Sequence, residues 1–147
     1  MKKKTLKGFT LIESLVVVFV CTFFMLLPTL SIERWQHMIE IEQFLSTFEK
    51  QLLFTQQMAI IKMTDTQIIF EEEQQQLYFI VSENEQIHLS VPTDLNASGP
   101  NKIVFKAISG NNGKLAKFTY DWPEKKQSIE FQFQLGSGRY VKKINRL

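Results

Sequence analysis

The fold is decided by Lys7-Gly8-Phe9-Thr10-Leu11-Ile12-Glu13 and by the apolar run that follows it as far as Ile32. The run from Phe9 to Ile32 has 24 residues and one charged residue, Glu13. As a helix it would be about 36 Å long, which exceeds the roughly 30 Å of a membrane's hydrocarbon core. Four lysines precede it, at positions 2, 3, 4 and 7. We therefore expect a single membrane-spanning helix whose N-terminus faces the cytoplasm.

Glu13 is the unusual residue of this predicted span. A carboxylate inside a membrane helix costs several kcal/mol, so it usually marks function and has a partner. No lysine, arginine or histidine lies between Phe9 and Ile32. Cleavage after Gly8 would create an α-amino group on Phe9, four positions before Glu13. The two charges could pair within one helix or between neighbouring subunits, and either pairing would offset the desolvation of both ions.

This arrangement of Gly8, Phe9 and Glu13 before a long apolar run resembles the prepilin signature of type IV pilins and type II secretion pseudopilins. The resemblance implies that a prepilin peptidase removes residues 1–8, that Phe9 becomes N-methylated, and that Glu13 guides docking into a filament. Pro28 lies inside the run and is expected to bend the helix. Filament-forming relatives usually carry their proline two residues later, at the position of Leu30 here.

Two ordinary explanations of the apolar run fit less well. A secretory signal peptide has an apolar core of roughly 7–15 residues and a small-residue cleavage site. The present run is longer, and residues 28–34 offer no such site. A plain signal anchor agrees with the length but gives no role to Glu13.

Charge is distributed unevenly along the chain. The formal net charge of +2 includes the four lysines before Gly8. Residues 33–100 hold 11 acidic and 3 basic residues, a net charge of −8, whereas residues 101–147 hold 10 basic and 3 acidic residues, a net charge of +7. Such asymmetry favours attraction between two halves of one domain, with nucleic-acid contact as the alternative. Cys21 is the one cysteine of the chain, so no intrachain disulfide can form.

Residues 33–64 predict an amphipathic continuation of the helix, so that one helix extends from about Thr10 to Lys62. No glycine or proline interrupts residues 33–63. Apolar residues recur there every three or four positions, with one gap at Thr55, and are expected to face the core: Trp35, Met38, Ile41, Leu45, Phe48, Leu52, Ala59 and Met63.

Residues 65–147 change to a period of two and predict a β domain outside the cytoplasm. About seven short strands are expected, with turns rich in Gly, Pro, Asn and charged residues between them. Residues 128–135 alternate strictly, with Leu135 among the inward positions, and residues 92–102 are expected to be a loop. The expected strands are 66–72, 76–81, 85–91, 103–108, 115–122, 128–135 and 139–144. The predicted fold class is therefore α+β, a long helix packed on an antiparallel sheet.

Two further stretches, residues 54–60 at the end of the helix and Leu135-Gly136-Ser137-Gly138-Arg139 near the C-terminus, are similar to the ComGD-type minor pseudopilins of competence systems. This resemblance implies a structural, non-enzymatic subunit of a membrane-anchored pseudopilus at the cell surface that aids DNA uptake during transformation. Its implied partners are the major pseudopilin, other minor pseudopilins and, indirectly, an assembly platform and ATPase. The alternatives are an H-type minor pseudopilin of type II protein secretion and a minor type IV pilus subunit.

No catalytic motif, cofactor motif or metal-ligand spacing stands out. His37 and His88 lie far apart in the sequence. Residues 71–73 are three glutamates, but adjacent residues of a strand point to opposite faces, which favours a solvated strand end over a metal site. The oxygen-bearing side chains of Asp94, Asn96 and Ser98 lack the closing acid of a calcium loop.

The basic C-terminal third is the remaining candidate for a site. Its cations, interleaved with aromatic residues, could contact DNA phosphates, whereas the ordinary alternative is the solvated face of a sheet or docking onto an acidic partner. A direct DNA receptor would bind DNA through the soluble part alone. The candidates for DNA contact are Lys114, Lys117, Lys125, Lys126, Arg139, Lys142, Lys143 and Arg146.

Overall fold

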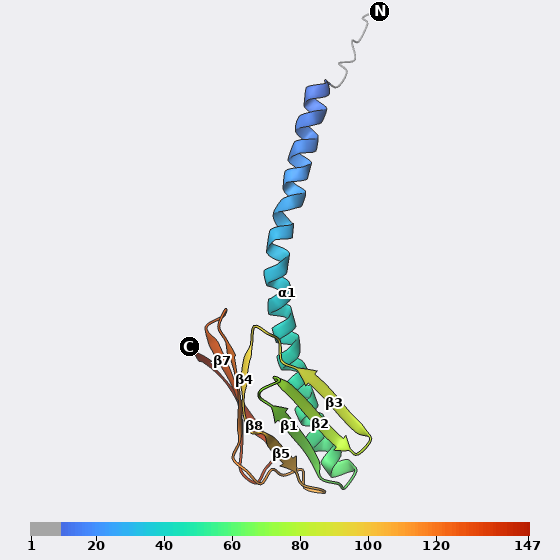
Figure 1. Ribbon diagram of the computed structural model, residues 1–147, viewed down its shortest axis with the longest axis vertical. Coiled ribbons are helices and arrows are strands. Elements are labelled where there is room, and N and C mark those ends of the chain that lie inside the picture. Colours follow the sequence, from blue (N-terminus) through green and yellow to red (C-terminus); the bar gives the residue numbers. More distant parts are fainter. Residues whose placement is uncertain (1–9) are drawn as a thin grey trace, which may run out of the picture. The chain divides into compact units, whose positions relative to one another are not determined.

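The computed structural model describes residues 10–147, and within the helix it describes residues 27–34 by their backbone alone. The chain forms two compact units, one ending at Met38 and the other comprising Ile39–Leu147. Eight strands follow one helix in this part of the chain, which confirms the α+β class (Figure 1). The elements are α1 (Leu11–Ile61), β1 (Thr66–Glu71), β2 (Gln76–Ser82), β3 (Glu85–Ser90), β4 (Asn96–Ser98), β5 (Lys102–Phe105), β6 (Lys117–Trp122), β7 (Gln127–Phe133) and β8 (Tyr140–Arg146).

The strands form two antiparallel sheets of four, where the sequence suggested a single sheet of about seven strands. The first sheet has the order β3-β2-β1-β5 and the second has the order β4-β6-β7-β8. Gln75, at the end of the β1–β2 turn, links the two sheets: its side-chain Nε2 donates to the carbonyl of Ala97 at 3.1 Å, and its Oε1 accepts from the Ala97 N–H at 3.0 Å. Ala97 is the central residue of β4, so these two hydrogen bonds help to hold the short strand in place.

Phe48 of α1 lies at the centre of the core of the second unit. Its side chain is fully buried, and its ring meets both sheets edge-on. The ring centroids lie 6.0 Å from Phe79 of β2, 5.4 Å from Phe118 of β6 and 5.0 Å from Phe131 of β7. Edge-to-face pairs at such distances add to the stabilisation that comes from burial. One helical face therefore fills the space between the inward rows of both sheets.

The predicted core row of the helix is confirmed from Ile41 to Ala59 and wrong at its two ends. Trp35 is 65% exposed and lies before the second unit begins. Met63 is also exposed, because α1 ends at Ile61 and Met63 has a positive φ of 54°. Thr55, which interrupts this apolar row, is also buried. Its hydroxyl donates to the carbonyl of Gln51 at 2.7 Å, so burial leaves this polar group with a partner.

Three strand predictions need correction. The predicted loop 92–102 contains β4, which pairs with residues 119–121 of β6. The predicted strand 103–108 ends at Phe105, because Asp65 holds the N–H of Ala107 at 2.8 Å and turns the chain. Leu135 is exposed and not inward, since β7 ends at Phe133.

In the part of the chain that the structure describes, no helix combines the length and the hydropathy that crossing a membrane requires.

Candidate functional site

The first turn of α1 holds Glu13, the central residue of the predicted assembly site. Gly8 and Phe9 lie outside the described residues. Thr10 caps the helix, because its carbonyl accepts the Glu13 N–H at 3.0 Å and its hydroxyl lies 3.4 Å from the same nitrogen. The spacing of Thr10 and Glu13 is that of a capping box. Among the described residues, the Glu13 carboxylate has no hydrogen-bond or ion-pair partner, so it is available to a cation outside this part of the chain.

The helix surface after Glu13 is apolar and exposed. Between Leu11 and Leu26 the exposed fraction of the large apolar side chains extends from 43% at Val20 to 85% at Leu11. The hydroxyl of Thr22 donates to the carbonyl of Val18 at 2.8 Å, so this polar group is satisfied within the helix. A continuous apolar surface of this kind marks contact with a membrane or with another protein. The backbone of α1 is helical through Pro28, and the bend expected there stays a prediction.

The two stretches that resemble competence pseudopilins meet in space at the end of the helix. Gln56 of α1 donates from its side chain to the carbonyl of Gly110 at 3.1 Å. Gly138 lies against the same carbonyl, since an added Cβ would stand 2.1 Å from it and 2.4 Å from the Gln56 amide nitrogen. Both glycines have positive φ. These contacts give the glycine-rich stretch a structural role, which fastens the β7–β8 turn to the helix.

The eight cations proposed for DNA contact do not form one surface. Lys142 is in register with the buried Phe131, whereas Lys143 is in register with Glu130, so the two lysines occupy opposite faces of β8. The remaining ones lie on β6, on two turns, in the loop before β6 and at the end of β8. Three of the eight are in ion pairs: Lys117 with Glu130 at 2.8 Å, Lys125 with Glu42 at 2.7 Å and Lys142 with Glu49 at 3.0 Å.

Ion pairs between the acidic residues 33–100 and the basic residues 101–147 support the interpretation that the uneven charge draws two halves of one domain together. Glu42 and Glu49 of α1 bind Lys125 and Lys142, and Asp65 binds Lys106 at 2.8 Å. The halves of the domain therefore attract each other at three places. Each pair is partly exposed, so each contributes little stability alone.

Glu49 is the acid that sequence reasoning missed. It accepts from the Tyr140 hydroxyl at 2.7 Å as well as from the Lys142 ammonium. Burial works to raise the pKa of Glu49, but the hydrogen bonds from Tyr140 and Lys142 outweigh it and the pKa is lowered. Burial, together with the bond to Glu49, raises the pKa of the Tyr140 hydroxyl. The only sequence signal for Glu49 was its position beside the apolar row of α1.

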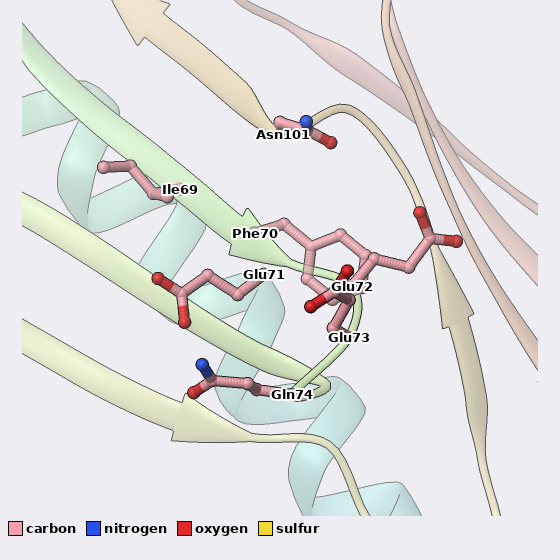
Figure 2. A pocket seen from close by; sticks show the side chains of 7 residues that line it. All are labelled: Ile69, Phe70, Glu71, Glu72, Glu73, Gln74 and Asn101. Atoms are coloured by element: carbon pink, nitrogen blue, oxygen red, sulfur yellow. The ribbon is translucent and has the colours of Figure 1, made fainter.

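The turn between β1 and β2 gathers Glu71, Glu72 and Glu73 beside a cleft of about 540 Å³ that Asn101 also lines. Figure 2 shows their carboxylates spread around the turn, without a common point toward which they converge. No group of three or more His, Cys, Asp or Glu side chains within the described residues could hold a metal ion. All three side chains are exposed, with Glu71 at the end of β1 and Glu72 and Glu73 in the turn.

Comparison with known proteins does not identify the chain. No protein-family model matches it, and neither the curated proteins nor the solved structures give a match.

Proposed function

We propose that this chain is a pilin-like structural subunit, a minor pseudopilin that is anchored in the membrane by residues 9–32 and assembles through that helix. The sequence motif at Gly8, Phe9 and Glu13 supports the proposal. The single observation that carries it is the Glu13 carboxylate, which has no partner among the described residues and lies at the start of an exposed apolar helix surface. An α-amino group of Phe9, in the same or a neighbouring subunit, supplies the missing cation. Residues 39–147 then form a domain outside the cytoplasm that contacts other subunits or cargo.

The cargo is proposed from resemblance. The stretches 54–60 and 135–139 favour a competence pseudopilus that aids DNA uptake, and secretion or pilus machines remain the alternatives. The ion pairs of Glu42 with Lys125 and of Glu49 with Lys142 lie within the domain and help to hold its own fold together.

Gly8→Glu is expected to abolish removal of the leader. A prepilin peptidase must fit the residue before the cut, and a charged side chain there replaces a hydrogen. Expressed together with a prepilin peptidase, the wild-type chain is expected to lose residues 1–8, whereas the variant is expected to stay at full length by intact mass. Ser14→Ala, which lies beyond the cleavage site, is the matched control and should be trimmed normally. Normal trimming of the Gly8→Glu chain would contradict processing by a prepilin peptidase.

Glu13→Gln is expected to leave trimming intact but to reduce incorporation into assemblies at least about tenfold, which corresponds to about 1.4 kcal/mol. Glutamine has nearly the same size and shape as glutamate but removes the charge that would pair with the α-amino group. Crosslinking of trimmed chains in membranes, followed by separation of the products by size, measures the effect. Equal yields from the variant and the wild-type chain would contradict a role of the Glu13 charge in assembly.

A further inference from the structure

A groove follows the free edge of β5. This strand is the outermost one of its sheet and pairs with β1 on its other side. At the end of this strand, Phe105 forms an isolated antiparallel bridge with Asn112, which also lines the groove. The groove has a volume of about 380 Å³, within the range of small-ligand sites. Three of the six residues that line it are lysines: Lys102, Val104, Lys106, Asn112, Gly113 and Lys114.

Both walls of the groove are held by polar contacts. The buried side chain of Asn112 accepts from the N–H of Lys114 at 2.9 Å and donates to its carbonyl at 2.7 Å, so it fixes the backbone there. On the opposite wall, Asp65 accepts from the Lys106 ammonium and from the N–H of Ala107, both at 2.8 Å. These contacts fix the backbone beside the groove, so a ligand would need to order little of it on binding.

The charge of the groove is not balanced by its own residues. Lys62, like Lys117, Lys125 and Lys142, has a carboxylate partner. The ammonium groups of Lys102 and Lys114, in contrast, have no hydrogen bond or ion pair with any described residue. No acidic residue lines the groove. Within the described part of the chain, two unpaired lysines thus line the groove together with a third that is ion-paired.

We propose that this groove binds a phosphodiester chain. Lysine ammonium groups serve as point charges for phosphate oxygens, whereas planar carboxylates favour the bidentate fork of arginine, which the groove lacks. From Lys102 to Lys106 the extended chain covers about 13 Å, a length of several nucleotides. Val104 and the bare backbone of Gly113 offer surface for sugars but few groups that could read bases. Binding is accordingly independent of base sequence, and the inference does not depend on the assembly proposal.

The test is binding of a fluorescently labelled single-stranded DNA 20-mer to the full-length chain in a non-ionic detergent, followed by polarisation at several salt concentrations. The variant Lys102→Gln/Lys114→Gln is expected to bind about tenfold more weakly near 0.1 M salt and to lower the salt slope by about 1.4. The matched control is Lys126→Gln/Arg146→Gln, which removes two unpaired cations outside the groove and should change affinity less than about twofold.

Competitors distinguish the sources of phosphate. Displacement of the labelled DNA by inorganic polyphosphate supports recognition of phosphate alone. Displacement by unlabelled DNA, but not by polyphosphate, supports additional contacts to the sugar. Displacement by polyglutamate with equal potency would overturn the inference in favour of an acidic protein partner. No binding by the wild-type chain, or equal weakening in both double variants, would also overturn it. Glu13→Gln should bind DNA normally, so failure of the assembly proposal would leave this result unaffected.

Discussion

Phe48→Ala is expected to lower the free energy of unfolding of the second unit by about 4 kcal/mol. The Phe48 ring is fully buried and contacts aromatic rings of both sheets, including Phe79 and Phe118. Its removal would leave a cavity between the sheets that neither can fill without losing its own packing. A domain of this size has a total stability of about 5–15 kcal/mol, so the loss would bring the variant close to unfolding.

Phe54→Ala on the same helix is the matched control. The Phe54 side chain is 36% exposed, so the same change in residue type removes less buried area and leaves no closed cavity. Urea unfolding followed by tryptophan fluorescence would measure both variants, with Trp122 as a reporter in the core. A loss for Phe48→Ala no larger than that for Phe54→Ala would show that the two sheets do not depend on this ring.

Local sequence patterns predicted the helix and most strands because those elements depend on neighbouring residues. The helix was expected from about Thr10 to Lys62 and extends from Leu11 to Ile61. An apolar run is followed there by apolar residues at three- and four-residue spacing, with one gap at Thr55, and Pro28 is the only proline or glycine. β4 escaped prediction because it has three residues, Asn96–Ser98, with loop-like composition. It pairs with β6, and the side chain of Gln75, which is distant in sequence, also holds its central residue.

The candidate sites also differ in whether local sequence could reveal them. Glu13 could be recognised from sequence, because a lone charge in an apolar run is a local anomaly. The lysine groove could not, since Lys102 and Lys114 come together only through the fold of the intervening loop and the bracket made by Asn112. The eight cations expected to contact DNA were grouped by composition alone. Register then separates neighbours such as Lys142 and Lys143 onto different faces.

Gly138→Ala is expected to lower the free energy of unfolding by about 3 kcal/mol. The residue has a φ of +64°, so any side chain there costs about 1–2 kcal/mol of backbone strain. An added Cβ would also stand 2.1 Å from the carbonyl oxygen of Gly110, and backbone cannot swing away as a flexible side chain can. The turn would have to move off the helix end and break the hydrogen bond from Gln56 to that carbonyl.

Gly136→Ala separates the two contributions, because Gly136 lies in the same turn with a φ of +74° and nothing within 4 Å of an added Cβ. It should show the backbone strain alone, about 1–2 kcal/mol. The excess loss in Gly138→Ala then measures the contact between the turn and the helix end, and Gln56→Ala should reduce that excess because the two changes share one contact. Equal losses at both glycines would mean that the stretch acts only as a flexible hairpin. A larger loss at Gly138 would show that this turn is fastened to the end of α1.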